Sequence, residues 1–441
     1  MTGPESPEPV EPGTGARAAH GPAALDLVTA RRRFLVLTAL RWFPVGLTIP
    51  VTVLLPVSRG LSLSQVGLAM AMQGVVVLLL ELPTGALADT VGRRRLLLLA
   101  GVFGLASTSL ILTSHSLVWY AVAWALQGVF RALDSGPLEA WFVDAALAAD
   151  PRARLERSLS AQGVVLGIAI GTGSLVSGAV IAWAPHGHLE PMAVPVACAL
   201  VLQVVSLVAI GTLMVDHAPH GGLAGAWRGV TGAPGAVRDG IGLVRADRVL
   251  RCIVLVELLW GFGMVAFEQL TPIRLSDLLG DPAAAAAISG PAAACAWLAS
   301  AGGAAVVPRC GTRWGVARTA MALRLVQGAT IVGIGFATGV VGALTAYLAC
   351  YAVHGASNPA HLTLLHGRVT GERRATVLSV NSMVGQPGSI VGTILLTWLA
   401  DRTSVGLACL VAAIVLASAA PLYLPAWRVE RAERAHAATV G

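Results

Sequence analysis

The stretch ELPTGALADTVGRRR, residues 81–95, places two acidic residues and three consecutive arginines between long apolar runs. Because so many neighbouring charges are costly in the hydrocarbon layer of a membrane, this stretch indicates a loop between two spans. Hydrophobic residues make up 56% and charged residues 12% of the 441 residues, and the mean hydropathy is +0.75. This composition excludes a soluble globular protein and predicts an integral membrane protein.

The charged residues and cysteines exclude several other classes of protein. The net charge is +7 and all 30 basic residues are arginine. Because most arginines flank apolar segments, they suit anionic lipid headgroups, and we expect no binding to nucleic acid. The 6 cysteines lack metal-ligand spacing, so we expect no metal and no cofactor. The sequence has no GxxxxGK[ST] loop and no grouped nucleophile, base and orienter, so we expect neither an ATP-driven pump nor an enzyme.

Twelve stretches of the sequence are long and apolar enough to cross the membrane as helices. The first half holds six, at residues 34–57, 63–88, 96–114, 117–142, 159–184 and 191–215. The second half holds six more, at residues 249–272, 283–307, 319–338, 341–366, 376–400 and 403–425. The sequence therefore predicts an all-α membrane protein with twelve transmembrane helices in two pseudo-symmetric six-helix bundles.

The two halves also repeat. SGPLEAWFVD at 135–144 aligns with SNPAHLTLLH at 357–366 at a spacing of 222, each at the end of the fourth span of its half. Repeats of this kind are typical of secondary transporters whose pathway runs between the halves. We divide the chain into a disordered tail at 1–30, bundles at 31–215 and 249–425, a linker with an amphipathic helix at 216–248, and a second tail at 426–441.

The arginines predict the orientation of the chain. Alternate connections hold arginine clusters, near residues 31–33, 93–95, 152–157, 309–318 and 368–374, whereas the intervening connections hold single arginines at 59, 274 and 402. Cytoplasmic loops retain positive charge, so we expect both termini in the cytoplasm and a multi-pass protein of the plasma membrane.

The loop between the second and third spans resembles the GxLaDrxGrkr signature of the major facilitator superfamily, matched by Gly85, Asp89, Gly92 and Arg93. The resemblance covers the whole membrane region and implies a transporter that works by alternating access. It implies that Asp89 faces the N-terminal end of span eleven and that Arg93 pairs with Asp144, together closing the cytoplasmic side. Alternatively, the arginines anchor the loop to lipid phosphates. The matching loop of the second half, VVPRCGTRWGVAR, lacks the acid.

Several charges fall inside predicted spans, where each costs about 2.5 to 3.5 kcal/mol unless it has a partner or water. By helical rise, Arg41, Glu81, Asp134 and Glu257 form one layer, roughly 12 to 15 Å from the inner edge. The family resemblance places spans one, four and seven around a central cavity, so we expect Arg41, Asp134 and Glu257 to meet there. Asp134 pairs with Arg41 or with Arg131 of its own helix, and a purely structural salt bridge is the alternative.

Glu268 follows Glu257 by three helical turns, so both carboxylates share one face of span seven. Exposure to water near the outer end is the alternative explanation for Glu268. We expect Arg324 to extend to the inner membrane interface. One helix cannot join the histidines of span ten into a metal site; among them, His354 is either a proton relay or a packed, hydrogen-bonded side chain.

Trp42, Trp124 and Trp260 lie in the spans expected around the cavity. Aromatic rings beside acids suit an apolar or cationic small molecule, although core packing is the alternative for each ring. GIAIGTGSLVSG at 167–178 only partly resembles the antiporter motif of the family, because Thr172 replaces its proline.

Together these features predict a monomeric exporter of a small, largely apolar drug or secondary metabolite, driven by the proton gradient. The alternatives are a proton-symport importer of a nutrient and a non-transporting sensor or lipid-handling protein.

Overall fold

The computed structural model describes residues 25–183, 190–215, 235, 238, 240–369, 371 and 374–440, without the side chains of 82–90, 375 and 437–440. Most of the expected N-terminal tail and of the linker therefore lies outside the described residues. Residues 241–246 of the linker are helical, and Val244 is buried against the second half, whereas Val237 is not described.

The described residues are mostly helical and contain no strand. The first half consists of α1 Leu27–Thr48, η1 Ile49–Val51, α2 Leu54–Ser58, α3 Leu63–Val91, α4 Arg93–Thr113, α5 Leu117–Asp134, α6 Pro137–Ala149, α7 Glu156–Trp183 and α8 Ala193–Leu213. The second half consists of α10 Arg248–Val265, η2 Ala266–Leu270, α11 Thr271–Leu279, α12 Pro282–Trp314, α13 Val316–Phe336, α14 Val340–His366, α15 Arg374–Arg402, α16 Val405–Ala417, η4 Ala420–Tyr423 and α17 Leu424–Val440.

Eleven helices in the described residues are long and apolar enough to span a membrane. The remaining predicted span, 117–142, is divided between α5 and α6, because Ser135 is extended and Gly136 adopts a left-handed conformation with φ of +96°. Glycine adopts this conformation without the steric penalty of a side chain. The twelve-helix arrangement is thus present, with its fourth span interrupted just after Asp134.

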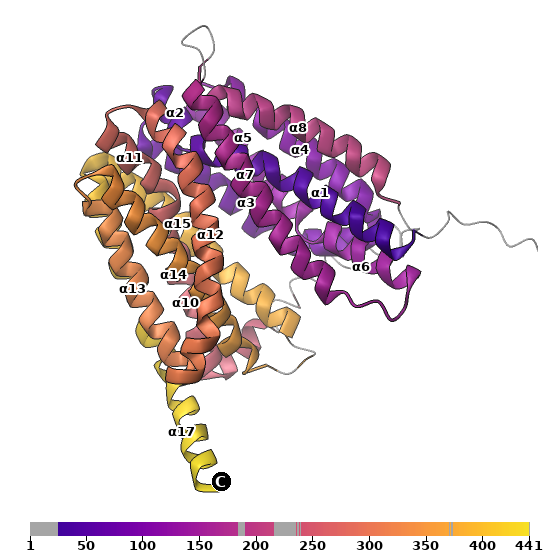
Figure 1. The fold of residues 1–441 in the computed structure, drawn as a ribbon, viewed down its shortest axis with the longest axis vertical. Helices are drawn as coiled ribbons and strands as arrows, with labels where there is room; N and C mark the ends of the chain where they lie inside the picture. Colours follow the sequence, from indigo (N-terminus) through magenta and orange to yellow (C-terminus); the bar gives the residue numbers. More distant parts are fainter. Residues whose placement is uncertain are drawn as a thin grey trace, which may run out of the picture.

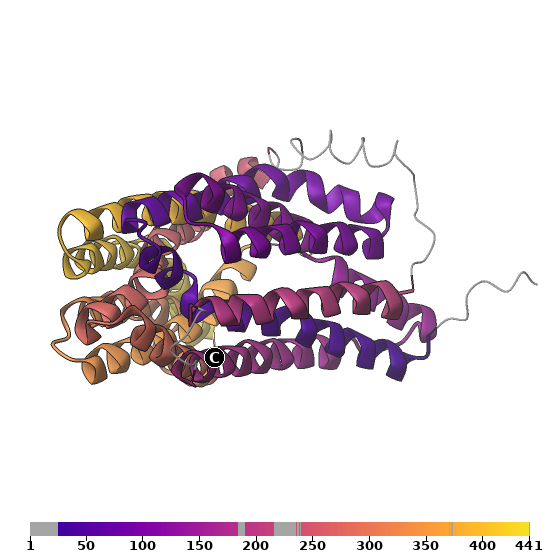
Figure 2. The ribbon, with the colours of Figure 1, turned by 90° about the horizontal axis from the view of Figure 1, so that it is seen from above.

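The two halves lie side by side and meet along two pairs of helices (Figure 1). Helix α7 of the first half packs against α12 of the second, and α3 packs against α15. Seen from above, the first-half helices run together away from the second half (Figure 2). The bundles meet near α2 and α11 and diverge toward α6 and α17.

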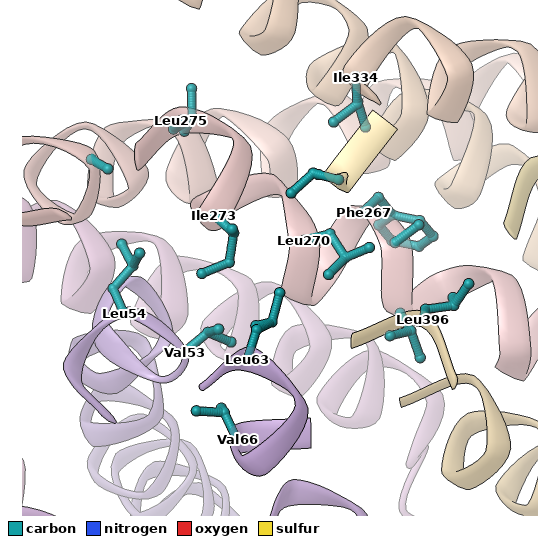
Figure 3. Packing of buried hydrophobic residues seen from close by; sticks show 14 of the residues in the cluster. Val53, Leu54, Leu63, Val66, Phe267, Leu270, Ile273, Leu275, Ile334 and Leu396 are labelled. Carbon is teal, nitrogen blue, oxygen red and sulfur yellow. The ribbon is translucent and has the colours of Figure 1, made fainter. Parts of the chain in front are cut away.

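A hydrophobic cluster joins the halves at the end that contains α2 and α11. It includes Val53, Leu54 and Leu63 of the first half and Leu270 and Ile273 of the second, all at most 9% exposed (Figure 3). Burial of such side chains contributes about 1.5 to 3 kcal/mol each. This end of the molecule is therefore closed by apolar packing, and we call it the closed end.

The opposite end has no shared cluster among the described residues. The cluster around Phe34 and Trp141 belongs to the first half alone, and the cluster around Leu250 and Tyr423 belongs to the second half alone. Each bundle thus has its own core there, and we call this the separated end.

Helix α17 occupies most of the expected C-terminal tail. The Glu430 carboxylate accepts hydrogen bonds from the backbone N–H groups of Val316 (2.9 Å) and Ala317 (3.1 Å), the first residues of α13. An acid at a helix N-terminus satisfies free donors and the helix dipole. The loop VVPRCGTRWGVAR of the second half, which has no acid of its own, is therefore contacted by an acid from α17.

Glycines permit close contact between the halves near the closed end. A Cβ atom on Gly290 of α12 would lie 2.4 Å from the Ser174 carbonyl oxygen and 2.8 Å from the Gly178 Cα atom of α7. A Cβ on Gly67 of α3 would lie 1.9 Å from Thr397 of α15. Contacts between small residues of this kind are typical of membrane helices.

We expect Gly290→Leu to force the halves apart at the closed end. In a cysteine-free background, a cysteine replacing Ser289 should then react faster with an impermeant maleimide added from that side. We expect about a tenfold increase in rate, which corresponds to a free-energy change of about 1.4 kcal/mol. Gly302→Leu is the matched control, because a Cβ at Gly302 has no neighbour within 4 Å. Equal labelling in both variants would contradict this account of the closed end.

Candidate functional site

A cavity of about 550 Å³ lies between the two halves, beside the closed end. Its walls come from α1, α3 and α5 on one side and from α10, η2, α11, α12, α14 and α15 on the other. The polar groups that line it include Gln73, Arg131, Glu257, Glu268 and Gln269. The volume is in the range of small-molecule sites, which span about 300 to 1,000 Å³.

Two carboxylates reach this cavity from the same span. Glu257 is on α10 and Glu268 is on η2, a π-helical segment that follows it directly. Single π-turns within α-helices are frequent at functional sites. Glu268 lies deep in the molecule but is exposed, because it faces the cavity. Glu257 and Glu268 therefore share one face, as their spacing predicts.

Aromatic rings form much of the remaining wall. Trp124 and Trp260 line the cavity as expected, and Trp297, Tyr347 and Tyr351 join them from α12 and α14. Sequence analysis did not predict the last three residues, because no motif identifies which face of these two helices looks inward. The cavity thus presents flat apolar surfaces beside two acids.

Arg131 is the basic residue among those that line the cavity. Its guanidinium acts electrostatically on Glu81 of α3 and on Glu268 of η2. No ion pair between Arg131 and Asp134 is present among the described residues, because Asp134 pairs with Arg41 instead. Glu81 itself is not among the lining residues.

Asp134 pairs with Arg41 of α1, one of the two arrangements that the sequence allowed. Asp134 is 4% exposed, and Arg41 also lies over the Trp42 ring, 4.5 Å from its centroid. The expected meeting with Glu257 is wrong, because Arg41, Asp134 and Trp42 are not among the cavity-lining residues and Glu257 contacts a histidine instead. Asp134 is the last residue of α5, and its side chain meets α1 rather than the cavity.

The histidine that Glu257 contacts is His361 of α14, with Nε2 and Oε1 3.3 Å apart. Nearby, Arg324 of α13 is only 2% exposed, so the expectation that it reaches the membrane interface is wrong. The helix turns it toward the interior, where its guanidinium donates to the Gln327 side chain at 3.0 Å. His354 stacks on the cavity residue Trp260, with ring centroids 5.6 Å apart, but does not itself line the cavity.

At the separated end, Arg93 pairs with Asp144 of α6 and also donates to the Ala140 carbonyl oxygen. Gly92 begins α4 with φ of +95°. The predicted roles of Gly85 and Asp89 concern a segment whose side chains lie outside the described residues. The signature loop is thus attached to its own half through Arg93.

At the closed end, an acid links α15 to α3. The Ser64 hydroxyl donates to the Asp401 carboxylate at 2.5 Å, and backbone N–H groups of Leu63 and Ser64 also interact with this carboxylate. Asp401 therefore joins the two halves beside the apolar cluster.

Comparison with known proteins places the chain among membrane transporters. The family model described as Major Facilitator Superfamily matches residues 34–386. No curated protein matches the sequence.

Solved transporter structures share the fold at low sequence identity. The chain is similar to the nucleoside transporter NupG, at 12% identity and a TM-score of 0.76 over 90% of this chain and 99% of that one. It is also similar to a bacterial homologue of the human lysosomal transporter Spinster, in an inward-facing conformation, at 14% identity and a TM-score of 0.71 over 91% and 97%. A bacterial homologue of the iron transporter ferroportin, also inward-facing, matches at 16% identity and a TM-score of 0.67 over 90% and 99%.

The Arg41–Asp134 pair gives a prediction about stability. Asp134→Leu leaves Arg41 without its counter-charge, and removal of one partner of a buried pair costs about 3 to 5 kcal/mol. We expect a lower thermal unfolding temperature in detergent and substantial recovery in Arg41→Met/Asp134→Leu. Arg434→Met, which breaks an exposed pair with Glu430, is the control and should cost less than about 1 kcal/mol. An unfolding temperature unchanged by Asp134→Leu would show that the pair is dispensable.

Proposed function

The chain belongs to the major facilitator superfamily, and on this premise we propose that it exports a small, largely apolar compound with a cationic group in exchange for protons. One observation carries the proposal, namely the cavity between the halves, with its aromatic walls and the carboxylates of Glu257 and Glu268. Ionisable groups at membrane depth mark substrate or ion pathways by default. The lining residues thus offer apolar contact and negative charge together.

The substrate class follows from the chemistry of the walls. Trp124, Trp260 and Trp297 offer apolar and π-faces to an organic ring or an alkyl ammonium group. A carboxylate can hold a cationic group or a proton, but not both with equal affinity. Competition between proton and substrate at the same acids is a direct physical route to exchange.

The two ends of the molecule suggest how access alternates. Arginine-rich loops, including residues 93–95, lie at the separated end, so we assign this end to the cytoplasm and the apolar cluster to the outside. In the opposite state the outer cluster and the Ser64–Asp401 contact would open. The signature loop with Asp89, Arg93 and Asp144 would then close the cytoplasmic end.

The proton gradient of the plasma membrane can supply enough energy for export. If two protons enter for each monovalent cation exported, one net charge crosses the membrane, and 100 mV then contributes about 2.3 kcal/mol, roughly a fiftyfold concentration ratio. One-for-one exchange moves no net charge and is driven by the pH difference alone. We propose that the protein is a monomer, since each half contributes one wall of a single cavity. We also propose that both termini lie in the cytoplasm, on the side of the arginine-rich loops.

We expect organic cations with apolar bodies to dissipate an imposed proton gradient in inside-out vesicles that contain the protein. The double variant Glu257→Gln/Glu268→Gln removes both cavity acids and should reduce this proton flux by about tenfold or more. A tenfold loss of rate corresponds to about 1.4 kcal/mol in free energy. Glu433→Gln, an exposed acid on α17, is the control and should keep the flux.

The direction of substrate flux separates export from import. Accumulation of labelled compound inside these inverted vesicles supports export, whereas proton-driven efflux from them supports the importer. If no compound in a broad library of organic cations moves protons through folded protein, the exchange proposal is wrong.

A further inference from the structure

A chain of polar side chains extends from the cavity wall into the core of the second half. The Glu257 carboxylate is 3.3 Å from His361 Nε2, and His361 Nδ1 is 2.9 Å from the Tyr423 hydroxyl. The Arg324 guanidinium in turn interacts electrostatically with the Tyr423 hydroxyl. Of these four residues, Glu257 alone is among those that line the cavity.

This chain is buried in apolar surroundings. His361 and Tyr423 are each 1% exposed and Arg324 is 2% exposed, and the surrounding second-half cluster includes Val256 and Ala320. An isolated cation in such a place costs several kcal/mol. Among the described residues, Arg324 has no carboxylate within ion-pair distance, but it interacts electrostatically with Glu257. The carboxylate of Glu257, at the other end of this chain of side chains, therefore balances the charge of Arg324.

The donors and acceptors of the chain fit one protonation pattern. Arginine carries only donors, so the positive charge of Arg324 favours the orientation in which the Tyr423 oxygen faces Arg324 and the Tyr423 O–H donates to His361 Nδ1. His361 is then neutral and carries its proton on Nε2, which it donates to the Glu257 carboxylate and shares with the Asn381 side-chain oxygen at 3.2 Å. Each bond points from the buried cation toward an ionised Glu257.

Protonation of Glu257 disrupts this pattern. A neutral carboxyl is a weaker acceptor for His361, and it no longer balances the charge of Arg324. The chain must then reorganise inside the helix core, where α10, α13, α14 and η4 meet. Among the described residues, no comparable chain starts at Glu268, which projects into the cavity near the exposed Arg131 and the wall residues Tyr347 and Tyr351.

We propose that Glu257, and not Glu268, carries the coupling proton, and that His361 is the positioning residue that links its protonation to the buried Arg324. This inference rests on the proposed proton exchange. The charged and titratable groups that face Glu257 are His361 from α14, Arg324 from α13 and Tyr423 from η4, while α15 presents Gly385 and Asn381. A proton taken up from the cavity would thereby alter the packing of four helices.

The first test measures protonation without any transported compound. Difference infrared spectra of the full protein in detergent, recorded against pH, follow the carboxyl band that disappears in Glu257→Gln. His361→Leu removes the donor that stabilises the ionised carboxylate, so half-protonation should move to higher pH by about one unit. Tyr423→Phe and His361→Gln, which alter the chain more gently, should shift it in the same direction by less.

Three comparisons distinguish a positioning role from a general structural one. His366→Leu, at the end of the same helix, should leave the midpoint unchanged. In the Glu257→Gln background, His361→Leu should change neither the residual proton flux nor the remaining carboxyl bands at any pH, because His361 acts through Glu257. Glu268→Gln should leave the Glu257 band and its midpoint in place.

Two outcomes would overturn the inference, namely an unshifted midpoint in folded His361→Leu, His361→Gln and Tyr423→Phe, or a pH profile of proton flux that follows Glu268 alone. Neither outcome would remove proton exchange itself. A different result is also informative: no compound drives proton flux, but the infrared midpoint still shifts when His361 is replaced. This result would reject the transport proposal and leave the link between Glu257 and Arg324 intact.

Discussion

The requirement that every charge at membrane depth be compensated governs the arrangement of this molecule. Asp134 is neutralised by Arg41 within the first bundle, and Arg324 is balanced through a chain of polar side chains within the second. Glu257, Glu268 and Arg131 have a different solution, because they face a cavity between the bundles. In a medium without water to solvate them, these groups must be satisfied by protein or by a polar space. The helices are arranged so that both conditions are met.

The same requirement separates structural charges from those available to a ligand. Asp134 is almost fully buried, and its pair with Arg41 lies away from the cavity-lining residues. The pair therefore holds α1 against the end of α5. The cavity acids are accessible to small molecules and protons. Depth along the helices predicts one layer for Arg41, Asp134 and Glu257, but depth does not show which way a side chain points around its helix.

The sequence predicts the helices of this protein better than the contacts between them. Length and hydropathy identified the twelve spans, and the Arg93–Asp144 contact followed from the signature loop. The spacing of Glu257 and Glu268 correctly placed both on one face. Arg324 was placed wrongly because the distance from a helix end predicts depth, whereas burial depends on which neighbours surround the helix. The role of His361 is not predicted from the sequence, since its partners come from distant segments, including Asn381 and Tyr423.

By itself the sequence determined that this chain is a membrane protein of two six-helix halves, because apolar length and arginine-rich loops are local properties. Tertiary structure decided which residues form the cavity, that Asp134 meets Arg41, and that a buried cation is connected to Glu257. These are relations between helices far apart in the chain, and they depend on rotation and close packing that no single segment encodes. The end at which the two halves touch was likewise decided by the apolar cluster they share, a property of neither half alone.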